Sequence, residues 1–175
     1  TRDGGQTYSG GALIGANLIL SNIGDGAITL AGNVDAAPGV TPTLVIQGAL
    51  MSSADIGLNG PLGSLQVLGP GQLCGHIVTV GGQNYGPIVL CGDLTTESTS
   101  GAEITFNTID ATKGGAMESL HVIGAAIFGG RVGGVGRAEI DQKHPGVDGF
   151  ARAHGATARL RLEGCRPPSV KERAR

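Results

Sequence analysis

The sequence of 175 residues contains no tryptophan, only five phenylalanine and tyrosine residues, and few charged side chains, which make up 15% of the chain. A compact domain of this length usually builds its core from bulky residues, so their scarcity argues against a single thick core. The net charge of −2 and the 40% hydrophobic content argue against a disordered chain. We therefore expect a core assembled from many thin aliphatic layers.

Several functional motifs are also absent from the chain. It contains no Gly-x-Ser-x-Gly, Gly-x-x-x-x-Gly-Lys or His-Glu-x-x-His pattern, which gives no basis for a nucleophile elbow, a P-loop or a zinc-protease site. No apolar run approaches the roughly 18 residues of a membrane span. We therefore expect no transmembrane segment.

Glycine is abundant, with 33 residues, but shows no three-residue period, which excludes collagen. Glycine also interrupts every candidate helix in the region 1–130. Between the turn residues lie short runs with strand character. These runs are Leu18–Leu20, Ala27–Leu30, Leu44–Ile46, Ser64–Leu68, His76–Val80, Pro87–Leu90, Glu103–Phe106 and Leu120–Ile123.

The chain repeats itself, which is typical of a solenoid. Gly4–Tyr8 returns as Gly81–Tyr85, and Ser64–Gly69 resembles Ser119–Gly124. A hairpin architecture is disfavoured because the one Asn-Gly pair, Asn59-Gly60, is followed by proline. The pattern predicts an all-β parallel β-helix with five or six coils of roughly 20 to 25 residues.

The character of the sequence changes near residue 131. Residues 1–130 carry two basic and nine acidic side chains, whereas residues 131–175 carry ten basic and five acidic ones. We predict a β-solenoid region over 1–134 and a separate basic tail over 135–175, where Ala158–Leu162 is the one strand-like run. The tail has three interpretations: a poorly ordered extension, an arm that binds nucleic acid or anionic lipid, or the product of a frameshift. It lacks the aromatics of a base-stacking surface, so no nucleic acid is expected.

Five short elements of the region 1–134 form a further pattern. They are Gly81–Tyr85, Ile104–Phe106, Ile109–Ala111, Ser119–Gly124 and Phe128–Gly134. With these elements the region resembles the repeats of large bacterial exoproteins such as filamentous haemagglutinin and autotransporter adhesins. The resemblance implies a right-handed parallel β-helix, export to the outer surface, and a stalk or adhesin that meets a receptor or glycan. It implies no catalytic residues.

Candidate catalytic and metal-binding residues are sparse. Asp93 and Glu97 are the nearest acidic pair in the repeats, and other carboxylates could meet only through the stacking of coils. His76 and His121 are expected to be exposed. His144 and His154, in the tail, lack the spacing of zinc ligands. We expect no catalytic residues, no cofactor and no metal.

The spacing of the three cysteines does not indicate a framework of several disulfides. The spacing between Cys74 and Cys91 is close to the length of one coil, so they could either form a disulfide or lie buried as small apolar side chains. The sequence favours burial. Cys165, in the tail, has no partner.

These observations predict a structural or adhesive segment of a secreted or surface-displayed bacterial repeat protein. The chain begins in mid-repeat at Thr1 without a leader, so we expect a fragment with neighbouring repeats in a longer chain. The alternatives are a carbohydrate-active β-helix enzyme, either a lyase or a glycosidase, and a non-functional remnant of an adhesin gene. The sequence names no ligand and no receptor.

Overall fold

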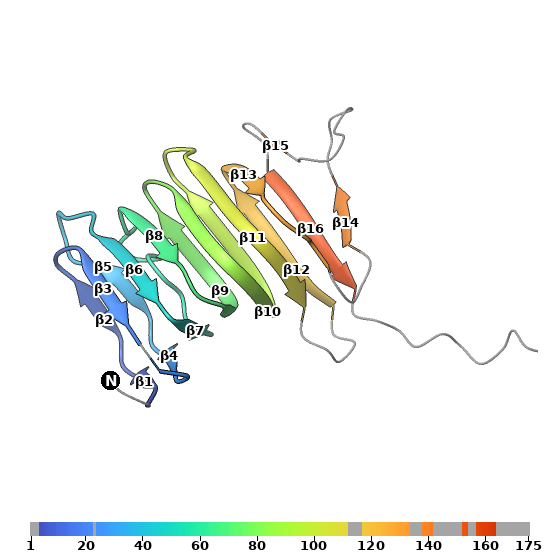
Figure 1. The fold of residues 1–175 in the computed structure, drawn as a ribbon. Coiled ribbons are helices and arrows are strands. Elements are labelled where there is room, and N and C mark those ends of the chain that lie inside the picture. The colour runs from blue at the N-terminus through green and yellow to red at the C-terminus, as the bar shows by residue number, and fades with distance from the viewer. Residues whose placement is uncertain are drawn as a thin grey trace, which may run out of the picture.

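The protein is an all-β parallel solenoid of about six turns (Figure 1). The computed structural model describes residues 4–22, 24–111, 117–133, 138–141, 152–153 and 157–163, and these residues contain no helix. The predicted fold class is therefore confirmed.

Sixteen strands form the described structure. They are β1 (Gln6–Tyr8), β2 (Ala12–Ile14), β3 (Leu18–Ser21), β4 (Ala27–Leu30), β5 (Val34–Ala36), β6 (Thr43–Gln47), β7 (Ala49–Ser52), β8 (Ser64–Val67), β9 (Gly71–Thr79), β10 (Gln83–Ser98), β11 (Glu103–Ala111), β12 (Met117–Ile123), β13 (Ala125–Phe128), β14 (Ala138–Asp141), β15 (Arg152–Ala153) and β16 (Thr157–Glu163).

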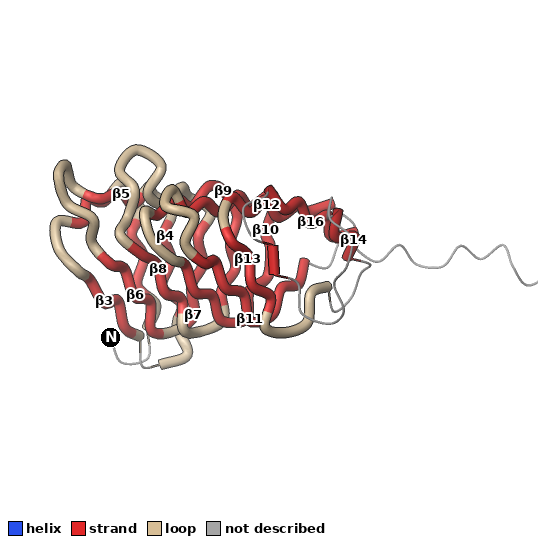
Figure 2. Tube along the Cα trace, turned by 90° about the horizontal axis from the view of Figure 1, so that it is seen from above, coloured by secondary structure: helices blue, strands red, loops and turns tan. Residues whose placement is uncertain are grey.

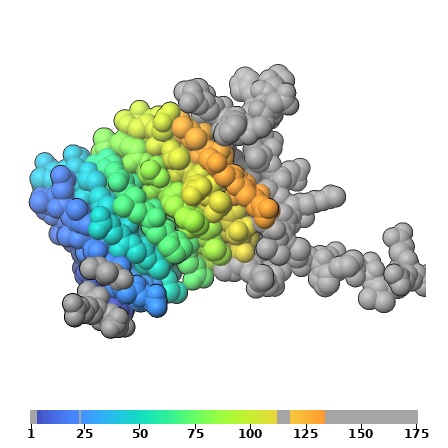
Figure 3. Space-filling view, in the orientation of Figure 1, coloured from blue at the N-terminus to red at the C-terminus, as the bar shows by residue number. Residues whose placement is uncertain are grey.

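Each coil passes over three faces in a fixed order. Face A contains β1, β4 and β7, face B contains β2 and β5, and face C contains β3, β6 and β8. Beyond these, the longer strands turn corners: β10 pairs with β8 on face C, with β9 on faces A and B, and with β12 on face B. Figure 2 shows the coils side by side along the axis, and Figure 3 shows them as successive bands of colour.

Successive coils differ little in length. On face A the residues that pair with one another from coil to coil follow at spacings of 22, 22, 21, 17 and 21. They are Gln6, Ile28, Leu50, Gly71, Ile88 and Ile109. The predicted coil length thus holds on this face for every coil except the shorter one from Gly71 to Ile88.

The core consists of aliphatic and aromatic columns that run along the axis, because parallel strands in register place like side chains above one another. On face C the inward column is Ile46, Val67, Tyr85, Phe106 and Phe128. The ring centroids of Tyr85 and Phe106 are 5.0 Å apart, and those of Phe106 and Phe128 are 5.5 Å apart. Three of the five Phe and Tyr residues of the chain thus form one continuous stack.

Asparagine and aspartate side chains link neighbouring coils. In each link a side-chain oxygen accepts a hydrogen bond from a backbone N–H of the next coil, 21 to 26 residues later. The acceptor and donor pairs are Asn17 and Thr43, Asn33 and Asp55, Asp35 and Asn59, Asp55 and His76, and Asp93 and Ser119. These bonds satisfy backbone groups where the chain leaves the ladder at a corner.

A loop of residues 37–42 joins β5 to β6. Its tip contains Gly39 with φ of +81°. At the corner after Ile56, Gly57 has φ of +75°, and a Cβ atom there would lie 2.1 Å from the backbone oxygen of Val78. Only glycine fits this close approach of two coils.

At the C-terminal end the direction of pairing reverses. β16 is antiparallel to β12, β15 is antiparallel to β13, and β14 pairs with β16. β16 includes the strand-like run Ala158–Leu162 that the sequence marks in the tail. The rest of 135–175, apart from these three strands, lies outside the described residues, so a disordered or aberrant tail stays a prediction there.

The sequence repeat does not follow the coil. The two Gly-Gly-Gln-x-Tyr segments occupy 4–8 and 81–85, but Gln6–Tyr8 lies on face A whereas Gln83–Tyr85 lies on face C. In both copies the tyrosine hydroxyl donates to the Oε1 of the glutamine two residues earlier. The repeated segment therefore lies on a different face in each of its two copies.

Candidate functional site

Chemistry-bearing side chains gather on the outer surface of face B. Strand register aligns one residue from each of five successive coils, and we call this set the polar column. It consists of Asn33, Asp55, His76, Thr95 and His121. Their positions alternate with buried Val34, Ile56, Ile77, Thr96 and Val122, so the column lies on the outer side of the sheet.

His76 stands at the middle of the polar column. Its backbone N–H donates to Asp55 Oδ1 at 2.9 Å, and its Nε2 lies 3.7 Å from Oε2 of Glu97. The side chains of His76 and Glu97 are 32% and 30% exposed. His76 Nε2 itself is buried and makes no hydrogen bond within the described part of the chain, so what this pair exposes is the rest of the two side chains.

The sequence predicted that His76 and His121 are exposed, and this was wrong, because both are half-buried. β10 carries Glu97 next to His76 on the same face. His121 lies in β12, which is paired on one side with β10 and on the other with β16. Neighbouring strands therefore cover part of each imidazole.

The acidic side chains are distributed over different faces. Glu103 lies on face C, whereas Asp93 and Glu97 lie on face B. Asp93 and Glu97 are four residues apart on one extended strand, hence about 13 Å apart along it. This is beyond the roughly 5 to 9.5 Å between the two carboxyl groups of glycosidases. Asp93 Oδ1 instead accepts bonds from the N–H and hydroxyl of Ser119, so this pair does not form a catalytic dyad.

Within the described residues, no three His, Cys, Asp or Glu side chains gather closely enough to hold a metal ion. The same part of the chain contains no helix that is long and apolar enough to cross a membrane. His144, His154 and Cys165 lie outside the described residues.

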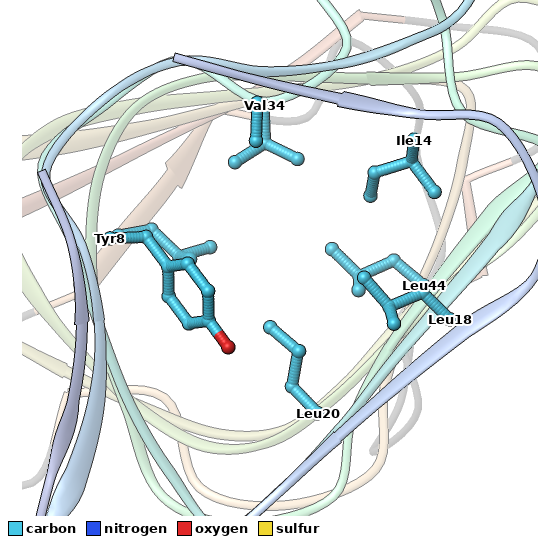
Figure 4. Close-up of a pocket in the computed structure, with 8 residues that line it drawn as sticks. Tyr8, Ile14, Leu18, Leu20, Val34 and Leu44 are labelled. Atoms are coloured by element: carbon cyan, nitrogen blue, oxygen red, sulfur yellow. The ribbon is translucent and has the colours of Figure 1, made fainter. Parts of the chain in front are cut away.

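An apolar hollow opens at the N-terminal end of the solenoid (Figure 4). It has a volume of about 50 Å³ and is bounded by side chains of the first two coils. They are Tyr8, Ala12, Ile14, Leu18, Leu20, Leu30, Val34 and Leu44. Further along the axis the inward side chains are covered by the next coil, so the hollow lies where the described coils begin.

No protein-family model, no curated protein and no solved structure matches this chain. The resemblance to exoprotein repeats is therefore supported at the level of the β-solenoid fold, and no family is assigned. What the chain does must be inferred from its own geometry.

Cys74 and Cys91 form a disulfide between neighbouring coils, with their Cα atoms 5.3 Å apart. The sequence favoured burial of both as unpaired apolar residues, and this was wrong. Both are half-buried at the corner between faces A and B. There β10 has two more residues than β9 between Leu90 and Leu94, which brings Cys91 beside Cys74.

A buried polar group lies inside the core between faces B and C. Tyr85 Oη donates to Gln83 Oε1 at 2.6 Å, and Gln83 Nε2 donates to Thr79 Oγ1 and to the backbone oxygen of Glu97. Burial raises the pKa of Tyr85 well above its usual value of 10.0. The side chains of Tyr85, Gln83 and Thr79 are buried and bonded to one another, which indicates a structural role.

Sequence reasoning missed the polar column and the apolar hollow. The column could not be found because its members follow one another at unequal spacings, each roughly one coil from the next. The available signal was the recurrence of Asn, Asp or His immediately before an aliphatic residue, as in Asn33-Val34, Asp55-Ile56 and His76-Ile77.

Proposed function

We propose that this chain is a structural and adhesive segment of a secreted or surface-displayed bacterial repeat protein. The observation that carries the proposal is the uninterrupted parallel stack of about six coils, whose columns are filled by aliphatic and aromatic side chains. Such a stack extends by adding coils and presents a long outer surface. The role of the segment is to lengthen the protein and to present this outer surface to a partner.

The disulfide supports an extracytoplasmic location. Bonds of this kind form and persist in oxidising compartments and are rare where thiols are kept reduced. Cys74 and Cys91 are half-buried and join two coils that already pair through β9 and β10. The bond therefore reinforces the stack, as expected of a protein exposed to a harsh exterior.

The polar column supports a contact surface for a glycan or a protein receptor. It presents amide, carboxylate, hydroxyl and imidazole groups at the spacing of the coils, about 4.8 Å. Side chains fixed on a rigid sheet lose little entropy when they bind a ligand. A ligand with polar groups repeating along its length fits this surface.

Adhesion is tested with beads coated with the purified chain. We expect saturable binding to a cell surface or to an immobilised glycan, and weaker binding of His76→Ala and Thr95→Ala beads. Gln72→Ala, on the outer side of face A, is the matched control and should bind like the unaltered chain. Equal binding by all three variants would contradict a contact surface on face B.

A second candidate is a carbohydrate-active enzyme, which the proximity of His76 and Glu97 on an outer face favours. Incubation with a panel of polysaccharides distinguishes the two functions. An adhesive segment leaves the polymers uncut, whereas a lyase or glycosidase releases new unsaturated or reducing ends. Loss of such release in Glu97→Gln would establish the enzyme.

A further inference from the structure

The one Asn-Gly pair of the chain, Asn59-Gly60, lies in the turn between β7 and β8. Asn59 is exposed and Gly60 is half-buried. An asparagine reacts most readily with its own backbone when glycine follows it, because the next N–H can approach the side-chain carbonyl carbon where no Cβ stands in the way. The turn therefore contains an electrophile, Cγ of Asn59, beside a nucleophile, the nitrogen of Gly60.

The carboxylate of Asp35, in β5 of the preceding coil, contacts both reacting groups. Its Oδ1 accepts hydrogen bonds from the backbone N–H of Asn59 at 3.0 Å and from that of Gly60 at 3.4 Å. Its Oδ2 accepts from Nδ2 of Asn59 at 3.3 Å. One carboxylate thus touches the hydrogen that must leave the nucleophile and the amino group that must leave the electrophile.

The turn and the carboxylate are both held in place. The oxygen of Gly60 accepts a hydrogen bond from the N–H of Ala36 at 2.8 Å. A Cβ atom on residue 60 would lie 2.5 Å from the backbone oxygen of Ala36, so this close approach requires glycine. Asp35 is 9% exposed, and the pairing of β5 with β2 fixes its backbone. The reacting groups and the carboxylate therefore meet in one geometry, which lowers the entropic cost of reaction.

We propose that Asn59-Gly60 is a self-modifying site, at which Asp35 transfers the proton. Oδ1 of Asp35 accepts the proton of the Gly60 N–H as this nitrogen attacks Cγ of Asn59. The bond between Cγ and Nδ2 then breaks, and Oδ2 returns the proton to Nδ2, which leaves as ammonia. A succinimide ring remains, and Asp35 is again a carboxylate. Water opens the ring at either carbonyl and leaves aspartate or isoaspartate at position 59.

The other asparagines are less suited to this reaction. All five precede a residue larger than glycine, whose side chain hinders closure of the ring. These following residues are Leu18, Ile23, Val34, Tyr85 and Thr108. Asn17 and Asn33 also use their side-chain oxygen to accept a backbone N–H of the next coil. Position 59 should therefore react first.

The reaction changes the link between the second and third coils. Nδ2 of Asn59 donates to Asp35, whereas a carboxylate in its place has no hydrogen to donate and carries the same charge as Asp35. Isoaspartate also adds its Cβ atom to the main chain, which displaces Gly60 from Ala36. The corner that joins these two coils therefore loosens as the protein ages.

Peptide mapping by mass spectrometry tests the site. The purified full chain is incubated at neutral pH, and the conversion of each asparagine is followed over time. We expect Asp35→Asn to slow conversion at position 59 at least about tenfold, since a positioned general base contributes about 10²- to 10⁴-fold. Asp93→Asn removes a similar link, from Asp93 Oδ1 to the N–H of Ser119, and is the matched control, with an unaltered rate at position 59. An unmodified position 59, or equal rates with and without Asp35, would overturn the proposal.

Unfolding provides a second measurement, which does not depend on the folding of a variant. In concentrated urea Asp35 is separated from the turn, so position 59 should convert more slowly than in the folded chain. Faster conversion in urea would show that the fold protects Asn59, and this would refute the role of Asp35.

Thermal melts test the consequence for the coils. Asn59→Asp should melt at a lower temperature than the unaltered chain. Asn84→Asp makes the same change of charge on an exposed side chain whose partners in register are Gln66 and Thr105, so it should melt like the unaltered chain. Identical melting of all three proteins would contradict the loosening of the corner.

Discussion

Tyr85 carries two structural roles at once. Its ring begins the aromatic stack with Phe106, while its hydroxyl donates to Gln83 inside the core. Tyr8 makes the corresponding bond to Gln6 on the first coil, where the ring is half-buried. The same Gln-x-Tyr motif is therefore present once with a buried tyrosine and once with a half-buried one. The two copies allow the effect of burial to be compared within one protein.

Replacement of Tyr85 by phenylalanine should lower the free energy of unfolding by about 1 to 3 kcal/mol, because Gln83 Oε1 is left buried without its donor. The matched change Tyr8→Phe should cost less, since water can reach the half-buried group. Urea denaturation followed by circular dichroism measures both. Equal losses in the two variants would contradict the importance of burial.

Alkaline pH should destabilise the protein through the same residue. Burial raises the pKa of Tyr85, so above about pH 10 the unfolded chain loses this proton while the folded chain retains it. Stability is then unaffected by this group below pH 10 and falls by up to about 1.4 kcal/mol per pH unit above it. Tyr85→Phe should show a shallower decline between pH 10 and 11.5 in thermal melts. A decline as steep as that of the unaltered chain would rule out Tyr85 as its source.

At the scale of the element, the sequence predicted strands where aliphatic residues are contiguous. Ala27–Leu30 coincides with β4, and Leu44–Ile46 lies within β6. The strands it missed include β2 and β5, where three-residue runs contain alanine or aspartate. Their strand character comes from pairing with each other across coils, which a local pattern does not carry.

The prediction about the cysteines failed for a similar reason. The spacing of 17 residues allowed a bond, but the local extra residues in β10 that align Cys91 with Cys74 depend on the register of two coils. The candidate site shows the same limit, because the polar column arises from register between strands and not from a motif.

Loss of the disulfide should weaken the stack between β9 and β10. The bond closes a loop of 17 residues, which corresponds to about 3 kcal/mol of stabilisation through restriction of the unfolded chain. Dithiothreitol should therefore lower the urea midpoint of the chain. The double variant Cys74→Ala/Cys91→Ala should have the lower midpoint from the start and should not respond to dithiothreitol. A reductant effect that persists in the double variant would assign it to another thiol.

At the scale of the whole molecule, stability should increase from the first described coil toward the middle of the solenoid. A terminal coil is held by one neighbour and an internal coil by two. Ala12 N–H bonds to Asn33 in the second coil, whereas Val78 N–H bonds to Ile56 between two internal coils next to the disulfide.

Hydrogen exchange measures this gradient. The amide of Ala12 should exchange at least about tenfold faster than that of Val78. The amide of Leu50, which bonds to Pro70 in the middle of the solenoid, serves as a second internal reference. Uniform rates across the three amides would mean that the solenoid opens as one unit.

The placement of the Gly-Gly-Gln-x-Tyr motif on two different faces has a consequence for how such a chain can be altered. A strand with its corner can occupy more than one face of the solenoid. Insertion of a single strand with its corner would move every later strand to the next face, a rotation of one third of a turn. The polar column would then be divided between two faces. Insertion of three such strands would add one complete coil and keep the polar column on a single face.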